Sequence, residues 1–414
     1  MTNKRKIIND PVYGFLTIDD DVIFDVISHP YFQRQRHIKQ LGFTSLVYPG
    51  AVHTRFSHML GALNLMTRAL EVLKVKGVAI TEEESLGVRL AILLHDVGHG
   101  PFSHTSERVI ADVHHEVLTL MFMRRINEEL PQDDKGRKPL DVAISIFEDS
   151  YPKHFLHQLV SSQLDMDRLD YLSRDSFFSG VSEGVVGTER IINMLNVCND
   201  ELVIDEKGIY SVEKFIISRR LMYWQVYMHK TVIAADTLLL NLLRRVRQLI
   251  GRGIVVSGPE YLMGFMSQSY DAESFEVDAS LLERFSLIDD NDVMTAVKGW
   301  MSHDDIVLST LSKQLVHRHL AAIRVSDRPF ASEQIEQLRM RAQELYCISL
   351  DETAYFVGTG ILRNHAYDFN DQEIKVLYKD GSCRDISEAS DQLDRHFLEK
   401  QVTKYYIYFP KELK

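Results

Sequence analysis

Apolar residues recur at helical spacing over most of this chain, and this periodicity restricts its possible folds more than any other feature. The stretch 54–73 carries them at Phe56, Met59, Leu60, Leu63, Leu65, Met66 and Leu70. Thr81-Glu82-Glu83-Glu84 is a capping-box start, and the helix that it opens is predicted to run to His95-Asp96. Gly98 and Gly100 then end that helix. We therefore expect a mainly α fold.

The remaining segments divide into helices and a few strands. Further helices are predicted at 20–27, 30–41, 106–127, 161–175 and 212–250, and more follow as far as 345. Strand-like patterns stand at 15–18, 346–350, 373–378 and 404–409, and a hairpin is predicted at 202–210. The expected domains are a helical core with an N-terminal lead-in (1–250), a helical extension (251–345) and a small C-terminal α+β lobe (346–414).

Composition excludes several classes of protein. The chain has 414 residues, 45% of them hydrophobic, and a net charge of −12. A nucleic-acid-binding protein usually carries a basic excess, so a nucleic-acid partner is not expected. The N-terminus shows no apolar signal segment and no apolar run approaches membrane-spanning length, so we expect a soluble, cytoplasmic protein without a membrane partner. Three scattered cysteines, with no CxxC spacing, fit a reducing compartment.

Four residues carry the main chemical signal. His58 ends the run His53-Thr54-Arg55-Phe56-Ser57-His58, His95-Asp96 follow an apolar segment, and Asp167 lies further along the chain. Two imidazoles and two carboxylates suit one hard or borderline divalent metal ion and leave coordination positions open. Such an ion makes hydroxide available near neutral pH, which is the chemistry of phosphate-ester and anhydride hydrolysis.

Basic residues and further histidines surround these candidate ligands. Arg55 precedes His58 by three residues and shares its helix face, and Arg168 follows Asp167 directly. Both can hold phosphate oxygens, or each can instead pair with a nearby carboxylate such as Asp170. Five of the 17 histidines stand between positions 95 and 115, a concentration that favours a metal site over chance clustering.

These residues are similar to the H…HD…D pattern of the HD-domain phosphohydrolase superfamily. Longer stretches resemble its deoxynucleoside triphosphate triphosphohydrolase (dNTPase or dGTPase) branch, including the HD core of the vertebrate enzymes that also carry a SAM domain. The matching stretches are 9–14, 32–42, 49–58, 95–104 and 165–175, and the likeness runs from residue 6 to about 250. The resemblance implies that the helical core at 1–250 is an HD-domain catalytic core.

The resemblance also implies a role for each matching residue. His58, His95, Asp96 and Asp167 would bind the metal. His104 would lie near the α-phosphate with His115 as its partner in proton handling, and Glu107 stands where the family has an aspartate. His99, Arg55, Arg168 and Arg219 would face the phosphate chain. Gln40, Leu41, Tyr171 and Asp175 would hold the sugar, and Tyr227 would exclude a 2′-hydroxyl.

The residues themselves fit this interpretation. Tyr171 and Asp175 are four positions apart and hence on one helix face. An aromatic edge such as that of Tyr227 can reject an extra oxygen sterically, although simple core packing would also explain it.

The expected reaction is hydrolysis of a deoxynucleoside triphosphate to a deoxynucleoside and inorganic triphosphate, by hydroxide attack on the α-phosphorus. One divalent ion per site (Mn, Fe, Zn, Ni or Mg) is expected, with further Mg possible on the nucleotide, and the resemblance implies a homo-oligomer, either dimer or tetramer. Two alternatives stay open. One is another HD reaction, on a phosphomonoester, a cyclic nucleotide or ppGpp; the other is a nucleotide-binding sensor or scaffold with little turnover.

Overall fold

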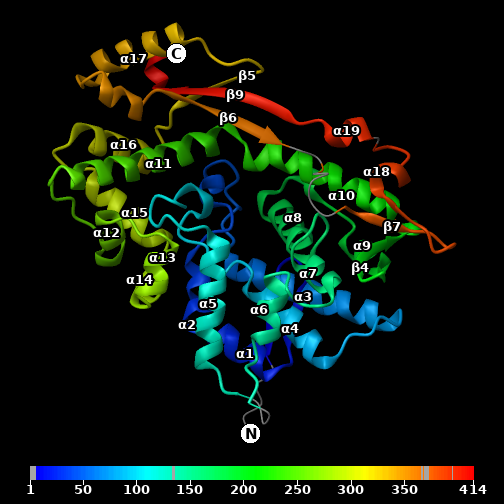
Figure 1. The fold of residues 1–414 in the computed structure, drawn as a ribbon. Coiled ribbons are helices and arrows are strands. Elements are labelled where there is room, and N and C mark those ends of the chain that lie inside the picture. The colour runs from blue at the N-terminus through cyan, green and yellow to red at the C-terminus, as the bar shows by residue number, and fades with distance from the viewer. Residues whose placement is uncertain (1–5, 133–135, 365–366, 368–372, 394) are drawn as a thin grey trace.

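A computed structural model describes residues 6–132, 136–364, 367, 373–393 and 395–414. The mainly α class is confirmed (Figure 1). The helices are α1 Asp21–Ser28, α2 Pro30–Gln33, α3 Arg55–Val75, α4 Glu82–Leu94, α5 His115–Glu129, α6 Asp141–Phe147, α7 His154–Val160, α8 Met166–Ser179, α9 Thr188–Met194, α10 Ile209–Met222, α11 Lys230–Gly251, α12 Glu260–Ser267, α13 Ala272–Val277, α14 Ser280–Ser286, α15 Asp290–Trp300, α16 Ile306–Val316, α17 Ser332–Tyr346, α18 Ile386–Ala389 and α19 Arg395–Glu399.

Strands form three small sheets. They are β1 Lys6–Asp10, β2 Gly14–Ile18, β3 Leu195–Cys198, β4 Glu201–Asp205, β5 Ala322–Ser326, β6 Gly358–Asn364, β7 Lys375–Leu377, β8 Cys383–Asp385 and β9 Val402–Phe409. β1 and β2 make a hairpin, the second sheet has the order β3-β4-β7-β8, and the third has the order β5-β9-β6. All pairs are antiparallel except β4 with β7.

Helix α3 lies at the centre of the core because it buries side chains around most of its circumference, from Phe56 to Leu73. It packs against α4 and α8, and α4 also packs against α6. The predicted capping box at Thr81 is present: its hydroxyl accepts from the Glu84 amide, and the Glu84 carboxylate accepts from the Thr81 amide. α3, α4 and α8 therefore form the frame that carries the candidate metal ligands.

The long helix α11 crosses the molecule between the helical frame of α3, α4 and α8 and the β5-β9-β6 sheet (Figure 1). The strands of the C-terminal segment do not pair only among themselves. β9 pairs with β5 from the preceding segment, and β7 pairs with β4 from the first 250 residues. The C-terminal region is thus joined to earlier parts of the chain. None of the helices in the described part of the chain has the length and apolar character needed to cross a membrane.

Two predicted helices begin later than expected. The helix predicted at 106–127 is α5, which begins at His115, because Arg108 has a φ of 63° that a right-handed helix does not allow. The helix predicted at 161–175 is α8, which begins at Met166 because Asp165 caps it by accepting from the Arg168 amide at 2.7 Å.

Two strand predictions were also wrong. The hairpin predicted at 202–210 instead joins β3 and β4, where Asn199 and Asp200 have the positive φ angles, 52° and 64°, of a tight hairpin turn. The strand predicted at 346–350 does not form, because α17 runs to Tyr346 and Cys347 ends it with a φ of 52°.

Candidate active site

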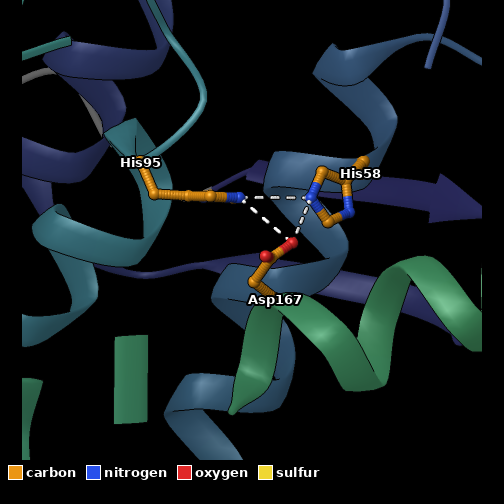
Figure 2. A group of neighbouring side chains, drawn as sticks. All are labelled: His58, His95 and Asp167. Atoms are coloured by element: carbon orange, nitrogen blue, oxygen red, sulfur yellow. Dashed lines mark hydrogen bonds and ion pairs between the residues drawn. The ribbon is translucent and has the colours of Figure 1, made fainter. Parts of the chain in front are cut away.

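Four side chains from three separate segments converge on one point. The Nε2 atoms of His58 and His95 are 3.2 Å apart, and Oδ1 of Asp167 lies 3.0 Å and 3.3 Å from them (Figure 2). The carboxylate of Asp96 completes the group at 3.7 Å from His58 and 3.6 Å from His95. Ligand atoms at about 2.1 Å from a tetrahedral metal ion are about 3.4 Å from one another. The spacing therefore fits a shared divalent ion.

The backbone explains how these residues meet. His58 lies in the first turn of α3, and His95 follows the last residue of α4. Asp167 lies in the first turn of α8, where Asp165 caps the helix. The loop after Asp96 approaches α5 so closely that a Cβ on Gly98 would lie 2.2 Å from the carbonyl oxygen of His115. Glycine is required there.

A buried chain of charges supports His58. Its Nδ1 lies 2.7 Å from Oδ2 of Asp170, Asp170 pairs with Arg174, and Arg174 pairs with Asp10 at 2.7 Å. Burial disfavours an imidazolium, but hydrogen bonds with Asp167 and Asp170 outweigh burial and raise the pKa of His58 to about 10. The carboxylates that favour a proton here also favour a divalent cation.

The two arginines have different partners. Arg55 forms an ion pair with Asp96 and donates from Nη2 to the Ser103 hydroxyl at 2.7 Å. Burial alone would raise the pKa of Asp96, but Arg55 and the neighbouring histidines hold it well below its usual range. Arg168 pairs with Asp165 at 3.3 Å, and not with Asp170, which belongs to Arg174.

An open cavity of ≈ 1210 Å³ lies directly beside the candidate metal ligands. Its wall contains most of the residues predicted for the site: Gln40, Leu41, Arg55, Asp96, His99, His115, Asp167, Arg168, Tyr171, Asp175 and Tyr227. The metal ligands His58 and His95 lie beneath this wall and do not line it, and neither do Arg219 and Glu107. Arg219 is buried at 8% exposure, and Glu107 contacts His115. Burial raises the pKa of Tyr171, and Arg219 is close enough to oppose that rise. The side chain of His104 lies outside the described residues.

One wall of this cavity is a polar cluster around Asp175. Its Oδ2 accepts from the Tyr227 hydroxyl at 2.8 Å, and its Oδ1 lies 2.7 Å from Nε2 of His53. The rings of Tyr171 and Tyr227 meet edge to face. Both oxygens of Asp175 are thereby fixed, and a carboxylate with two aromatic rings faces the cavity.

A group of histidines forms another part of the cavity wall. Nδ1 of His115 is 3.1 Å from Oε1 of Glu107, and the ring of His115 stacks on His99 with centroids 3.9 Å apart. Nε2 of His99 is 3.4 Å from Asp96. Burial and the positive charge of Arg55 lower the pKa of His99 well below its usual value, so this imidazole is neutral at pH 7.

Sequence reasoning missed several residues that shape the site. Asp290 accepts from the amides of Lys39 and Phe102 and so ties together two loops of the cavity wall. Phe102 and Ser103 have φ angles of 52° and 45°, a conformation that non-glycine residues rarely adopt and that accumulates at functional sites. The only local signal was an acidic residue at a helix start, since Asp290 is the first residue of α15 and Asp289 is its N-cap.

The chain is similar in sequence to proteins with an HD domain and in structure to a solved phosphohydrolase. The HD domain family matches residues 55–175, and the HD associated region matches residues 186–250. The uncharacterized protein YwfO of Bacillus subtilis is 32% identical over 99% of this chain and 93% of its own length. A deoxynucleoside triphosphate triphosphohydrolase SAMHD1 homolog of Dictyostelium discoideum is 34% identical, over 54% of this chain and 46% of its own length. A solved phosphohydrolase from Bacteroides thetaiotaomicron aligns with a TM-score of 0.93 and 47% identity, over 98% of this chain and 99% of that one.

Proposed function

Because this chain belongs to the HD-domain phosphohydrolase superfamily, we propose that it hydrolyses deoxynucleoside triphosphates to deoxynucleoside and inorganic triphosphate. The observation that carries the proposal is the cavity that joins the candidate metal ligands to the cluster of Asp175, Tyr171 and Tyr227. The Dictyostelium relative bears the name of this activity and is similar over 54% of this chain.

The buried donor set fits a divalent metal, held by His58, His95, Asp96 and Asp167. When bound, such an ion supplies a Lewis acid at a phosphoryl oxygen and lowers the pKa of water nearby. His58 and His95 are oriented for this role, since Asp170 holds one ring through Nδ1 and the carbonyl oxygen of Ile92 lies 2.6 Å from Nδ1 of the other.

Arg55 and Arg168 both line the cavity. Their guanidinium groups supply positive charge for the phosphate chain. Ser103 fixes the Arg55 guanidinium, and Asp165 with the carbonyl oxygen of Ser162 fixes Arg168 through Nε. Charges held in place before the substrate arrives need little reorganisation as negative charge develops on the phosphoryl oxygens.

The bond between the α-phosphorus and O5′ of the sugar breaks, a bond from phosphorus to a water oxygen forms, and O5′ takes up a proton. We assign proton delivery to His104, whose neighbours Ser103 and Thr105 line the cavity. Glu107 accepts from both the amide and the side chain of His115, which fixes the orientation of that ring for proton exchange.

Asp175 and Tyr171 are assigned to the sugar, together with Gln40 and Leu41. A carboxylate whose two oxygens are already fixed by His53 and Tyr227 is a rigid acceptor for a sugar hydroxyl. The Tyr227 ring is fixed through the same hydrogen bond, so a 2′-hydroxyl directed at it would have no space to occupy.

The test is product analysis with metal-loaded protein. Each dNTP and GTP is offered in the presence of manganese, and products are resolved by ion-exchange chromatography. Deoxynucleoside with intact triphosphate supports the proposal. Monophosphate with pyrophosphate would point to another HD reaction, and nucleotide binding without turnover would point to a sensor or scaffold.

A further inference from the structure

A second group of metal-type donors lies next to the candidate active site. Oε1 of Glu107 is 3.1 Å from Nδ1 of His115 and 3.7 Å from Nε2 of His114. The three donor atoms all lie within 4.8 Å of one another. The imidazole of His115 also lines the substrate cavity and stacks on His99, so this group adjoins the first metal position through a single ring.

The distances from Glu107 to the two imidazoles fit coordination of a shared metal ion. Glu107 accepts from the amide and the ring of His115, and His114 directs a second imidazole at the same carboxylate oxygen. In a tetrahedral site the donor atoms are about 3.4 Å apart, and the separations of 3.1 Å and 3.7 Å fall on either side of that value. Two imidazoles and one glutamate form a His₂Glu set that leaves a position open.

Surrounding contacts hold these donors in position. Nδ1 of His114 lies 3.5 Å from Oε2 of Glu116, which directs Nε2 of the same ring toward Glu107. A carboxylate on the second nitrogen is the usual support for a metal-bound histidine. The side chain of His114 is 42% exposed, whereas those of Glu107 and His115 are 15% and 16% exposed, so an ion can enter from solvent and bind partly enclosed.

We propose that Glu107, His114 and His115 form a second divalent-metal site, of a type suited to Zn²⁺, beside the active centre. An ion there engages the carboxylate of Glu107 and Nδ1 of His115 and withdraws both from proton exchange. This consequence for turnover, unlike the binding itself, rests on the proposed function. The site therefore acts as an inhibitory site for zinc.

Binding is tested with zinc alone on the full chain. Wild-type protein, His114→Ala and the control His154→Ala are equilibrated with Zn²⁺, and bound zinc per chain is measured by elemental analysis. His154 is an equally matched control because it is also a partly exposed histidine paired with a carboxylate, at 2.8 Å from Asp149. We expect one zinc fewer in His114→Ala than in the other two proteins. Equal zinc content in all three would overturn the proposal.

Inhibition is measured separately on manganese-loaded protein. His114 has no assigned part in turnover, so His114→Ala is expected to keep the wild-type rate without zinc. The zinc concentration that halves that rate is expected to rise about tenfold or more in this variant, the scale of effect that removing even an indirect partner of a ligand has. An unchanged concentration would overturn the inhibitory role. If no substrate turns over, the proposed function fails, while the zinc content still decides whether the site exists.

Discussion

Nδ1 of His58 lies 2.7 Å from Oδ2 of Asp170, and both side chains are fully buried although 112 positions separate them in the sequence. This contact leaves Nε2 of His58 directed at Asp167 and His95. Asp170 therefore orients a metal ligand without touching the metal position itself.

Replacing this carboxylate should weaken metal binding. Asp170→Asn keeps the size of the side chain but removes the charge that makes His58 a strong ligand, so manganese affinity should fall about 10- to 100-fold. Titration calorimetry on metal-stripped protein measures the manganese affinity. The solvent-exposed pair of Asp149 and His154 offers the control, since Asp149→Asn should leave affinity unchanged. Equal affinities in Asp170→Asn and wild type would show that Asp170 does not support His58 as a metal ligand.

Two variants of Tyr227 distinguish the effect of its hydroxyl on sugar selection from the effect of its ring. Tyr227→Phe loses the hydrogen bond to Asp175 but keeps the ring, whereas Tyr227→Ala removes both. If the ring excludes the 2′-hydroxyl, the ratio of kcat/KM for dGTP over GTP stays near wild type in the Phe variant and falls about tenfold in the Ala variant. A ratio that stays high in Tyr227→Ala would show that the discrimination lies elsewhere.

Asp290 should affect both stability and turnover. Asp290→Ala leaves the amides of Lys39 and Phe102 without their acceptors, at a cost of about 1–3 kcal/mol for each buried donor. Because these amides fix the loops that carry Gln40 and Ser103, kcat/KM should also fall. Thermal unfolding and steady-state kinetics measure the two effects. Asp271→Ala removes a helix cap outside the cavity wall and should lower stability alone; the same loss of kcat/KM in both variants would contradict this assignment.

Asp236 makes stability depend on pH. Burial raises the pKa of this cavity carboxyl to about 6, although a hydrogen bond with Thr105 lowers it. An unfolded chain releases the proton near pH 4, so the folded state becomes less stable as pH rises from about 4 to 6. Asp236→Asn should therefore gain stability over wild type across that window, reaching at most about 3 kcal/mol above it. Urea unfolding of metal-stripped protein at several pH values measures the gain, and a difference independent of pH would contradict the raised pKa.

The frame of the site was predictable because its signals are local. The apolar spacing of α3 and the capping box of α4 each lie within one segment, and His58 and His95 stand at the ends of these two helices. The converging positions of His58, His95 and Asp167 follow from that frame.

What escaped prediction depends on contacts between distant segments. The later start of α5 accompanies the left-handed backbone at Arg108, in a loop whose Asp112 amide donates to the carbonyl oxygen of Tyr270. The pairing of β7 with β4 joins strands about 170 residues apart, and hydrophobic pattern alone does not choose such a partner. Asp170, His53 and Asp290 likewise lie at least 112 positions in the sequence from the residues that they orient, which are His58, Asp175, and Lys39 with Phe102.

Oxygen-18 labelling shows whether water attacks the α-phosphorus and the bond to O5′ breaks. A deoxynucleoside triphosphate is hydrolysed in water enriched in oxygen-18, and both products are examined by mass spectrometry. We expect one labelled oxygen in the inorganic triphosphate and none in the deoxynucleoside, because the water oxygen bonds to the α-phosphorus. Label in the deoxynucleoside, or the appearance of labelled monophosphate with pyrophosphate, would contradict it.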